Sequence, residues 1–246
     1  MVCALFKNLA LTMNNSKNLV PAIIIMAKVP CEGSVKTRLR PFLTDAQCAE
    51  LAVCFLRDTF TKAAKITTNL IVALTPNDGA KELEKLLPKG AIFVTQTGKN
   101  LGERMTSAFA FAEAKGFSPL VMIGTDSPNF PSENFAETLD LFKNPQTEIV
   151  LGATTDGGYY LVALRRAAAE IFENVGWSSP KTFAQTAENA RFFFGAKPSK
   201  ISAWYDVDTP DDLKKLFDDY SRNKNFTETA PETARWLENN RKLFEG

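Results

Sequence analysis

The chain has 246 residues, of which 45% are hydrophobic, and its 29 Lys and Arg residues nearly balance its 28 Asp and Glu residues to give a net charge of +1. This length allows a full core and suits one large α/β domain at least as well as two small ones, and the balanced charge argues against a nucleic-acid partner. The chain contains no histidine, which excludes Ser-His-Asp and Cys-His catalysis, imidazole acid–base chemistry and histidine-bound zinc. Carboxylates must therefore supply any acid–base or metal-binding chemistry.

The cysteines and the N-terminal residues bear on location. No C-x-x-C pair occurs among Cys3, Cys31, Cys48 and Cys54, which argues against a zinc ribbon or a thioredoxin-type site and favours a reducing cytoplasm. Residues 1–20 are interrupted by Lys7 and Lys17 and lack a signal-peptide pattern, so we expect an N-terminal extension there. No run approaches the ~20 apolar residues of a membrane span, and we expect no membrane partner.

An apolar run at Ile23–Met26 leads into a loop that carries Gly33 and four cations. Apolar side chains at consecutive positions predict a strand buried on both faces of an α/β sheet. The loop then opens at the carboxyl end of the strand, where such sheets bind ligands. We interpret it as a phosphate-binding loop, although it has neither Walker nor G-x-G-x-x-G spacing. A solvated surface loop is the alternative. The cations are Lys28, Lys36, Arg38 and Arg40.

Helix and strand patterns alternate along the rest of the chain. Apolar spacing predicts helices over 45–65, with a cap at Thr44 or Asp45, and over 81–87, 101–115, 132–142, and from 177–180 to about 189. Strands are predicted at 70–74, 92–94, 120–123, 149–152 and 159–164. Thr209 and Pro210 predict a further helix start, and an amphipathic helix over 231–244 closes the chain. No internal repeat or long linker divides it.

Two acidic sites stand at expected element ends. Asp126 follows the strand at 120–123, where an unpaired buried carboxylate would be costly, and Asp206 and Asp208 precede the cap at Thr209. A divalent cation would offset that cost, whereas capping of the next turn is the alternative for Asp126. If the sheet is parallel, the strand ending at Ile123 delivers Asp126 to the ligand edge, and the segment before Thr209 can return Asp208 to the same edge.

Two further turns show candidate features. Gly98 and Gly102 flank a strand-to-helix turn beside Gln96, so a flat ligand such as a base could approach the backbone there, although structural turns also use glycine. Tyr159 and Tyr160 must face opposite ways on a strand. One of them could line a pocket while the other packs.

Taken in order, five segments give the chain a resemblance to a known family. They are 27–30 with Gly33 and 35–39, Gln96 with 101–105, 124–128, 156–161 and 206–210. Over residues 22 to about 220 the chain resembles the GT-A-fold nucleotide-diphospho-sugar transferases. Within them it is most similar to the radical-SAM/selenodomain-associated transferase 1 subgroup, also described as arsenosugar-biosynthesis-type glycosyltransferases.

The resemblance implies a Rossmann-like three-layer α/β/α sandwich with a mostly parallel central sheet. After the extension at 1–20, residues 21–246 would form a single GT-A-like domain. It would contain a nucleotide-binding half at about 21–128, an acceptor-side half at about 129–220 and a C-terminal helix at about 231–244.

The resemblance also implies roles for individual residues. The nucleotide would be bound by Ala27, Lys28, Gly33, Lys36, Thr37, Arg38, Gln96, Leu101, Gly102 and Thr125. Asp126 and Asp208 would hold Mg²⁺ or Mn²⁺, and the catalytic residues would be Asp126, Lys36, Arg38 and Asp156. The acceptor side would include Gly157, Gly158, Tyr159, Trp177 and Asp206.

The expected function is that of a metal-dependent glycosyltransferase, with a nucleotide-diphospho-sugar donor and a small-molecule acceptor as partners. A nucleotidyltransferase that releases pyrophosphate is the alternative, and a non-catalytic nucleotide-binding protein is another. In both reactions negative charge grows on phosphate oxygens, and a metal with Lys and Arg stabilises it. The chain departs from the subgroup at Ser179, where threonine is usual, and at Ala163, where glycine is common. Both positions lie in the acceptor half and leave the acceptor open.

Overall fold

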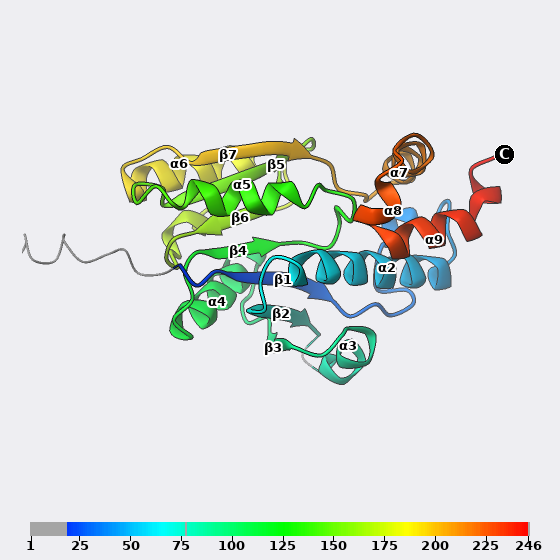
Figure 1. The fold of residues 1–246 in the computed structure, drawn as a ribbon, viewed down its shortest axis with the longest axis horizontal. Coiled ribbons are helices and arrows are strands. Elements are labelled where there is room, and N and C mark those ends of the chain that lie inside the picture. The colour runs from blue at the N-terminus through cyan, green and yellow to red at the C-terminus, as the bar shows by residue number, and fades with distance from the viewer. Residues whose placement is uncertain (1–18, 77, 246) are drawn as a thin grey trace, which may run out of the picture.

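The computed structural model describes residues 19–76 and 78–245, and within these ranges a seven-stranded sheet is covered by helices on both faces (Figure 1). This confirms the expected α/β class with a mostly parallel central sheet. The predicted extension at 1–20 lies outside the described residues except for its last two. The strand order is β3-β2-β1-β4-β6-β5-β7. The strands are β1 (Ala22–Lys28), β2 (Leu70–Thr75), β3 (Ala91–Thr95), β4 (Leu120–Ile123), β5 (Ile149–Thr154), β6 (Tyr159–Leu164) and β7 (Ser199–Trp204).

Strand directions decide which loops meet. β1 is parallel to β2 and β4, β2 is parallel to β3, and β5 is parallel to β7. Within the described ranges, β6 alone runs antiparallel, to β4 and β5. The carboxyl ends of β1, β3, β4 and β7 therefore open at one edge of the sheet, and the β1 and β4 arrows point to it on the right of Figure 1.

The α-helices largely match the expected segments. They are α2 (Asp45–Ala64), α3 (Ala80–Leu86), α4 (Leu101–Ala114), α5 (Glu133–Leu141), α6 (Thr182–Phe194), α7 (Pro210–Arg222), α8 (Phe226–Thr229) and α9 (Pro231–Asn239). Single turns of 3-10 helix are η1 (Thr37–Leu39), η2 (Glu170–Phe172) and η3 (Arg241–Leu243). Capping boxes at Thr44 and Thr209 start α2 and α7. The cap at Thr209 is confirmed, and of the two candidates for the first helix the structure selects Thr44 over Asp45. No helix in the described ranges is long and apolar enough to cross a membrane.

Three expected boundaries were wrong. α6 begins at Thr182, because Pro180 belongs to a turn in which the Thr182 hydroxyl donates to the carbonyls of Gly176 and Ser179. It also runs on to Phe194. The last α-helix stops at Asn239 and does not reach 244. The Asn240 side chain donates a hydrogen bond to the Trp236 carbonyl there, and the 3-10 turn η3 follows.

Separate cores fill the two faces of the sheet. On one face, α2, α3 and α5 place Phe60, Leu83 and Phe135 against Ile23 and Ile25 of β1. α4 and α6 cover the other face. Each buried Leu, Ile or Phe side chain stabilises the fold by roughly 1.5–3 kcal/mol, so the sheet forms a rigid support for the loops at its edge.

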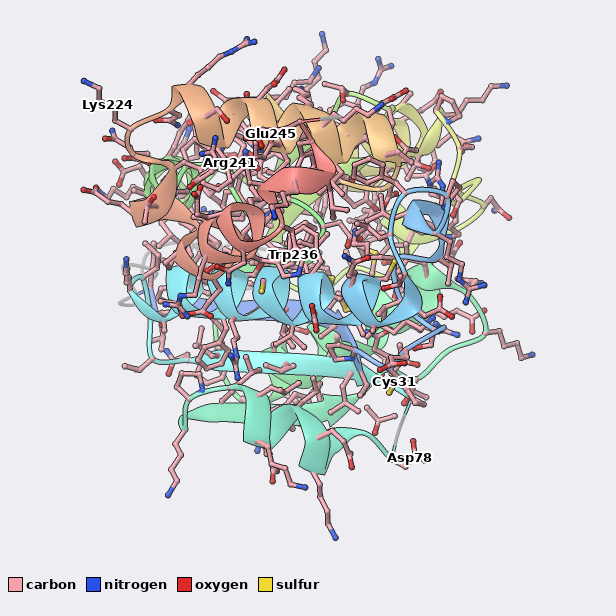
Figure 2. The ribbon with its side chains drawn as sticks, turned by 90° about the vertical axis from the view of Figure 1, so that its right-hand side faces the viewer. Cys31, Asp78, Lys224, Trp236, Arg241 and Glu245 are labelled. Carbon is pink, nitrogen blue, oxygen red and sulfur yellow. The ribbon has the colours of Figure 1, made fainter. Side chains whose placement is uncertain are left out.

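A third core joins the C-terminal helices to α2. Leu51 and Phe55 of α2 pack with Leu213 of α7 and with Trp236 and Leu237 of α9. Figure 2 views the molecule from the edge at which β1 and β4 end, and Trp236 lies there between α9 and α2. α2 is thereby buried on two sides, against the sheet and against α7–α9.

Candidate functional site

Four segments meet at the edge where the parallel strands end. They are the loop after β1, Gln96 after β3, the loop after β4, and residues 205–208 after β7. Together they line a cavity of about 530 Å³. Its polar lining includes Lys28, Lys36, Thr37, Arg38, Gln96, Thr125, Asp126, Ser127, Asp206 and Asp208. Most of the residues predicted to bind nucleotide or metal are therefore brought together.

Lys36 links the acidic segments to the first loop. Its backbone is left-handed at φ 48°, a conformation that costs a non-glycine residue on the order of 1–3 kcal/mol and that accumulates at functional sites. Its ammonium lies 2.5 Å from Asp126 Oδ1 and 3.3 Å from Asp208 Oδ1, and donates to the Val207 carbonyl at 2.8 Å. Only 8% of the side chain is exposed. The predicted convergence of Asp126 and Asp208 is thus observed.

The charge of Lys36 follows from its partners. Burial lowers the pKa of the ammonium, but the carboxylates of Asp126 and Asp208 more than compensate, so this pKa lies above its ordinary value. Arg38 approaches the same Asp208 with Nη1 3.3 Å from Oδ2, and its side chain is 68% exposed. The acidic pair is therefore matched by one buried cation and one exposed cation.

The other two cations of the loop brace its backbone. Lys28 Nζ donates to the Ser34 carbonyl at 2.6 Å. Arg40 donates to the Gly33 carbonyl and to Asp45 Oδ1, both at 2.8 Å. The four cations therefore divide into two that hold the loop and two that reach the carboxylates.

Asp206 completes the acidic group. Burial, with Asp126 and Asp208 nearby, raises the pKa of this carboxyl to about 7, although the Ser127 hydroxyl donates to it. Val207 N donates to the Asp126 carbonyl at 2.8 Å. The segments after β4 and β7 are thus directly hydrogen-bonded to each other.

The predicted base site divides into two environments. Gln96 Nε2 donates to the carbonyls of Ala27 and Ala73, at 3.2 and 2.8 Å, so the amide oxygen is the atom left to meet a ligand. Leu101 lines the cavity, but Gly102 does not. A Cβ on Gly102 would lie 2.7 Å from the Trp177 ring, so packing against Trp177 explains this glycine. Trp177 itself does not line the cavity.

The Asp-Gly-Gly turn between β5 and β6 is closed on itself. Asp156 Oδ1 accepts from the Thr154 hydroxyl at 2.5 Å and from Gly158 N at 3.1 Å. Gly157 has φ +92°, and a Cβ there would lie 2.3 Å from the Pro180 carbonyl oxygen. Asp156, Gly157 and Gly158 do not line the cavity. The structure therefore does not bring them to Asp126.

Tyr159 and Tyr160 belong to the cores on opposite faces of the sheet, as predicted, and both line the cavity. The Tyr160 hydroxyl donates to the Ser202 carbonyl and accepts from Asn134, and burial raises its pKa to about 12. Among residues 19–76 and 78–245, Tyr159 Oη is buried without a hydrogen-bond partner. Tyr159 thus offers the cavity an apolar wall, and Asp206 is the other acceptor-side residue that lines it.

Sequence reasoning missed Ser127, Asn129 and Lys62. Lys62 is buried in α2 and donates to the carbonyls of Pro128 at 2.9 Å and of Phe130, behind Asp126. A signal existed, since Lys62 lies seven residues after Phe55 on the apolar stripe of the helix. Asn129 had no comparable signal, because its partners are more than seventy residues away.

The donor set limits how a metal could bind. Across residues 19–76 and 78–245, no group of three or more Cys, Asp or Glu side chains is gathered to hold an ion alone. Asp126 and Asp208 nevertheless both point at one positive charge, the Lys36 ammonium. Two carboxylates with remaining ligands from water or phosphate are the kind of site that Mg²⁺ uses. These two residues therefore fit a divalent cation that a ligand helps to bind.

Comparison with solved structures identifies the class of fold. The chain has the fold of the nucleotide-diphospho-sugar transferases. A protein from Desulfovibrio desulfuricans G20, provisionally described as a nucleotide-diphospho-sugar transferase, is 28% identical, with a TM-score of 0.83 over 91% of this chain and 96% of its own. The expected GT-A-like architecture is thereby confirmed.

More distant structures share the fold alone. A cytidylyltransferase from Leptospira borgpetersenii serovar Hardjo-bovis is 14% identical, with a TM-score of 0.53 over 93% of this chain and 98% of its own. A 4-diphosphocytidyl-2C-methyl-D-erythritol synthase from Anaerococcus prevotii is 11% identical, with a TM-score of 0.53 over 79% and 93%.

At the level of sequence families, residues 58–179 match the family described as "Uncharacterized protein conserved in bacteria (DUF2064)". No curated protein matches the chain. The matched segment runs from α2 to the turn before α6 and contains Asp126. It excludes the loop of Lys36 and the segment of Asp208, which the structure adds to the site.

Proposed function

We propose that this chain is a metal-dependent glycosyltransferase that takes a sugar from a nucleotide-diphospho-sugar and transfers it to a small-molecule acceptor. The observation that carries the proposal is the buried Lys36, which pairs with Asp126 and Asp208 in a cavity at the carboxyl edge of the sheet. The 28% identity with the D. desulfuricans protein supports the donor class. The finer proposal is the radical-SAM/selenodomain-associated transferase 1 subgroup, supported by the five segments described above.

Mg²⁺ or Mn²⁺ is the proposed cofactor, with Asp126 and Asp208 as its protein ligands. Both carboxylates face one cation, and without a positive charge between them one would have to take up a proton. When bound with a diphosphate, such an ion supplies positive charge at the oxygens on which negative charge develops.

The chain's own residues would orient the donor. Arg38 lies beside Asp208 and is largely exposed, so its guanidinium is placed to bind a phosphate oxygen. The buried ammonium of Lys36 adds a second positive charge to the site. The Gln96 amide oxygen would accept a hydrogen bond from the base beside Leu101. These groups bind and stabilise the leaving nucleoside diphosphate, which is electrostatic catalysis that requires no histidine.

The acceptor side rests on fewer contacts. Tyr159 and Asp206 line the cavity and are the residues we propose to face the acceptor. A catalytic role for Asp156 would require the β5–β6 turn to open, since its carboxylate is hydrogen-bonded within that turn. The cytoplasmic location expected from the cysteine pattern stays a prediction.

A donor screen tests the proposal without knowledge of the acceptor. Purified protein is incubated with individual sugar nucleotides, with and without Mn²⁺, and we measure the nucleoside diphosphate that is released when the sugar passes to water or to an added acceptor. We expect Mn²⁺-dependent release from at least one donor, and its loss in Asp126→Asn. Release of pyrophosphate from a nucleoside triphosphate and a sugar phosphate would identify a nucleotidyltransferase. Binding without any turnover would identify a non-catalytic protein.

A further inference from the structure

Asn129 joins the two segments that carry the acidic residues. It lies in the loop after β4, and 6% of it is exposed. Its Oδ1 accepts from Trp204 Nε1 at 3.0 Å, and its Nδ2 donates to the Tyr205 hydroxyl at 2.8 Å. One side chain thus bridges the Asp126 loop to the end of β7, directly before Asp206 and Asp208.

Both ends of this bridge are held. The Tyr205 hydroxyl donates to Asp219 Oδ2 of α7 at 2.5 Å, and the Trp204 and Tyr205 rings stack with centroids 5.8 Å apart. On the other side, the buried Lys62 donates hydrogen bonds to the carbonyls of Pro128 and Phe130, the residues on either side of Asn129. The amide therefore connects two segments that are themselves fixed to α7 and α2.

We infer that Asn129 is a positioning residue that sets the separation of Asp126 and Asp208 at which the two carboxylates can share one divalent cation. This inference rests on the proposed function. Metal ligands must be held to within about 0.5 Å by supporting hydrogen bonds. An amide suits the bridge because it offers a donor to Tyr205 and an acceptor to Trp204. An apolar side chain of similar size would leave the half-buried Trp204 Nε1 without its acceptor, and the Tyr205 hydroxyl would keep only its bond to Asp219.

The chain offers a matched control in Asn134. It is 5% exposed, and its Nδ2 donates to the hydroxyl of a buried tyrosine, Tyr160, at 2.7 Å. That tyrosine is also held by its bond to the Ser202 carbonyl. Asn134→Leu therefore removes an equivalent buried amide–tyrosine bond without touching the link between the two acidic segments.

The experiment is a Mn²⁺ titration followed by water-proton relaxation, with Mn²⁺ alone and with Mn²⁺ plus inorganic pyrophosphate. It compares wild type, Asn129→Leu and Asn134→Leu. In wild type, we expect pyrophosphate to strengthen Mn²⁺ binding. Asn129→Leu should weaken Mn²⁺ binding in the presence of pyrophosphate at least tenfold, whereas Asn134→Leu should change it less than twofold even though both variants unfold at a lower temperature.

A milder variant keeps the inference testable if Asn129→Leu does not fold. Tyr205→Phe removes the hydroxyl that accepts from Asn129 and donates to Asp219, but keeps the ring and the bond from Trp204 to Asn129, and we expect at least a threefold loss of Mn²⁺ affinity. Coupled binding in wild type together with wild-type affinity in the Asn129 and Tyr205 variants would overturn the inference alone, as would an equal loss in Asn134→Leu. Absence of any pyrophosphate effect in wild type would overturn the proposed function as well.

Discussion

Asp126 and Asp156 occupy similar places in the sequence, each in a polar turn after a strand that ends at the ligand edge, yet their surroundings differ. The Asp126 carboxylate meets Lys36, which is ninety residues away in the chain. The Asp156 carboxylate accepts from Thr154 and Gly158 within its own turn. Local hydrogen bonds account for Asp156, whereas Asp126 is paired only through the tertiary fold. An acidic residue that is unexplained locally is the stronger candidate for binding.

The cations of the first loop show the same contrast. Arg40 is held by Gly33 and Asp45 close by in sequence, whereas Lys36 and Arg38 reach Asp208 across the sheet. In both comparisons, the residues with distant partners line the cavity at the carboxyl edge of the sheet.

Removal of Lys36 should have the largest effect, because this side chain is the long-range partner that distinguishes Asp126 from Asp156. Lys36→Met removes the buried cation that Asp126 and Asp208 share and leaves only the exposed Arg38 beside Asp208. Because the two carboxylates are 47% and 39% exposed, we expect this to cost about 1–3 kcal/mol, between the values for a surface and a fully buried ion pair. We expect a loss of that order in the free energy of unfolding, measured by urea denaturation.

Added Mn²⁺ provides the control for this variant. It should raise the melting temperature of Lys36→Met more than that of wild type, because the ion replaces the missing positive charge and binds the folded state. Equal shifts in the two proteins would mean that the carboxylates do not share a cation.

Arg38 and Arg40 extend the comparison to the phosphate. Arg38→Ala should weaken nucleoside diphosphate binding by about 1.5–3 kcal/mol, the range for a charge-assisted contact, without lowering stability, since the side chain is largely exposed. Arg40→Ala should instead lower stability, because its bonds hold the loop. Titration calorimetry with thermal unfolding separates the two effects. Unchanged affinity in Arg38→Ala would show that this side chain does not bind the phosphate.

The buried Lys62, which donates to carbonyls of the loop after Asp126, should make the free energy of unfolding depend on pH. Burial lowers its pKa to about 7, with Asp58 and Glu133 opposing and Lys65 adding to the shift. Between about pH 7 and the ordinary lysine pKa of 10.5, the unfolded chain binds a proton that the folded chain does not. This group therefore makes stability rise with pH, by up to ~1.4 kcal/mol per unit.

Urea denaturation at pH 7.5 and 9 checks the sign. Wild type should gain stability relative to Lys62→Met as the pH rises, by about 1–2 kcal/mol over this interval. The raised pKa of Cys54 acts in the opposite direction but is present in both proteins. The same pH slope in both would show that Lys62 stays charged when folded.

The sequence predicted the parts of the fold whose signals are local. Consecutive apolar residues marked β1 and β4, and candidate caps at Thr44 or Asp45 and at Thr209 marked two helix starts. β7 was missed because, within it, only Ile201 is buried and its other side chains are exposed or half-buried. A half-covered edge strand lacks the apolar run that identifies a central one.

The candidate site was predicted where residue type and position agree, and missed where contacts are long-range. The predicted strand end at Ile123 and the predicted helix start at Thr209 correctly placed Asp126 and Asp208 at one edge. Gly102 was interpreted as an approach for a base, but its partner is the Trp177 ring, which no local pattern reveals. The link through Asn129 depends on Trp204 and Tyr205, and only the folded chain brings them together.

The most direct test of the account compares Asp126→Asn with Asp156→Asn in one assay. Mn²⁺ binding is followed by water-proton relaxation with and without a nucleoside diphosphate. Asp126→Asn should abolish the nucleotide-dependent gain in Mn²⁺ affinity while the protein stays folded. Asp156→Asn should retain that gain and lose about 1 kcal/mol of stability from its turn. A gain that survives in Asp126→Asn, or that vanishes in Asp156→Asn, would contradict the assignment of the metal to Asp126 and Asp208.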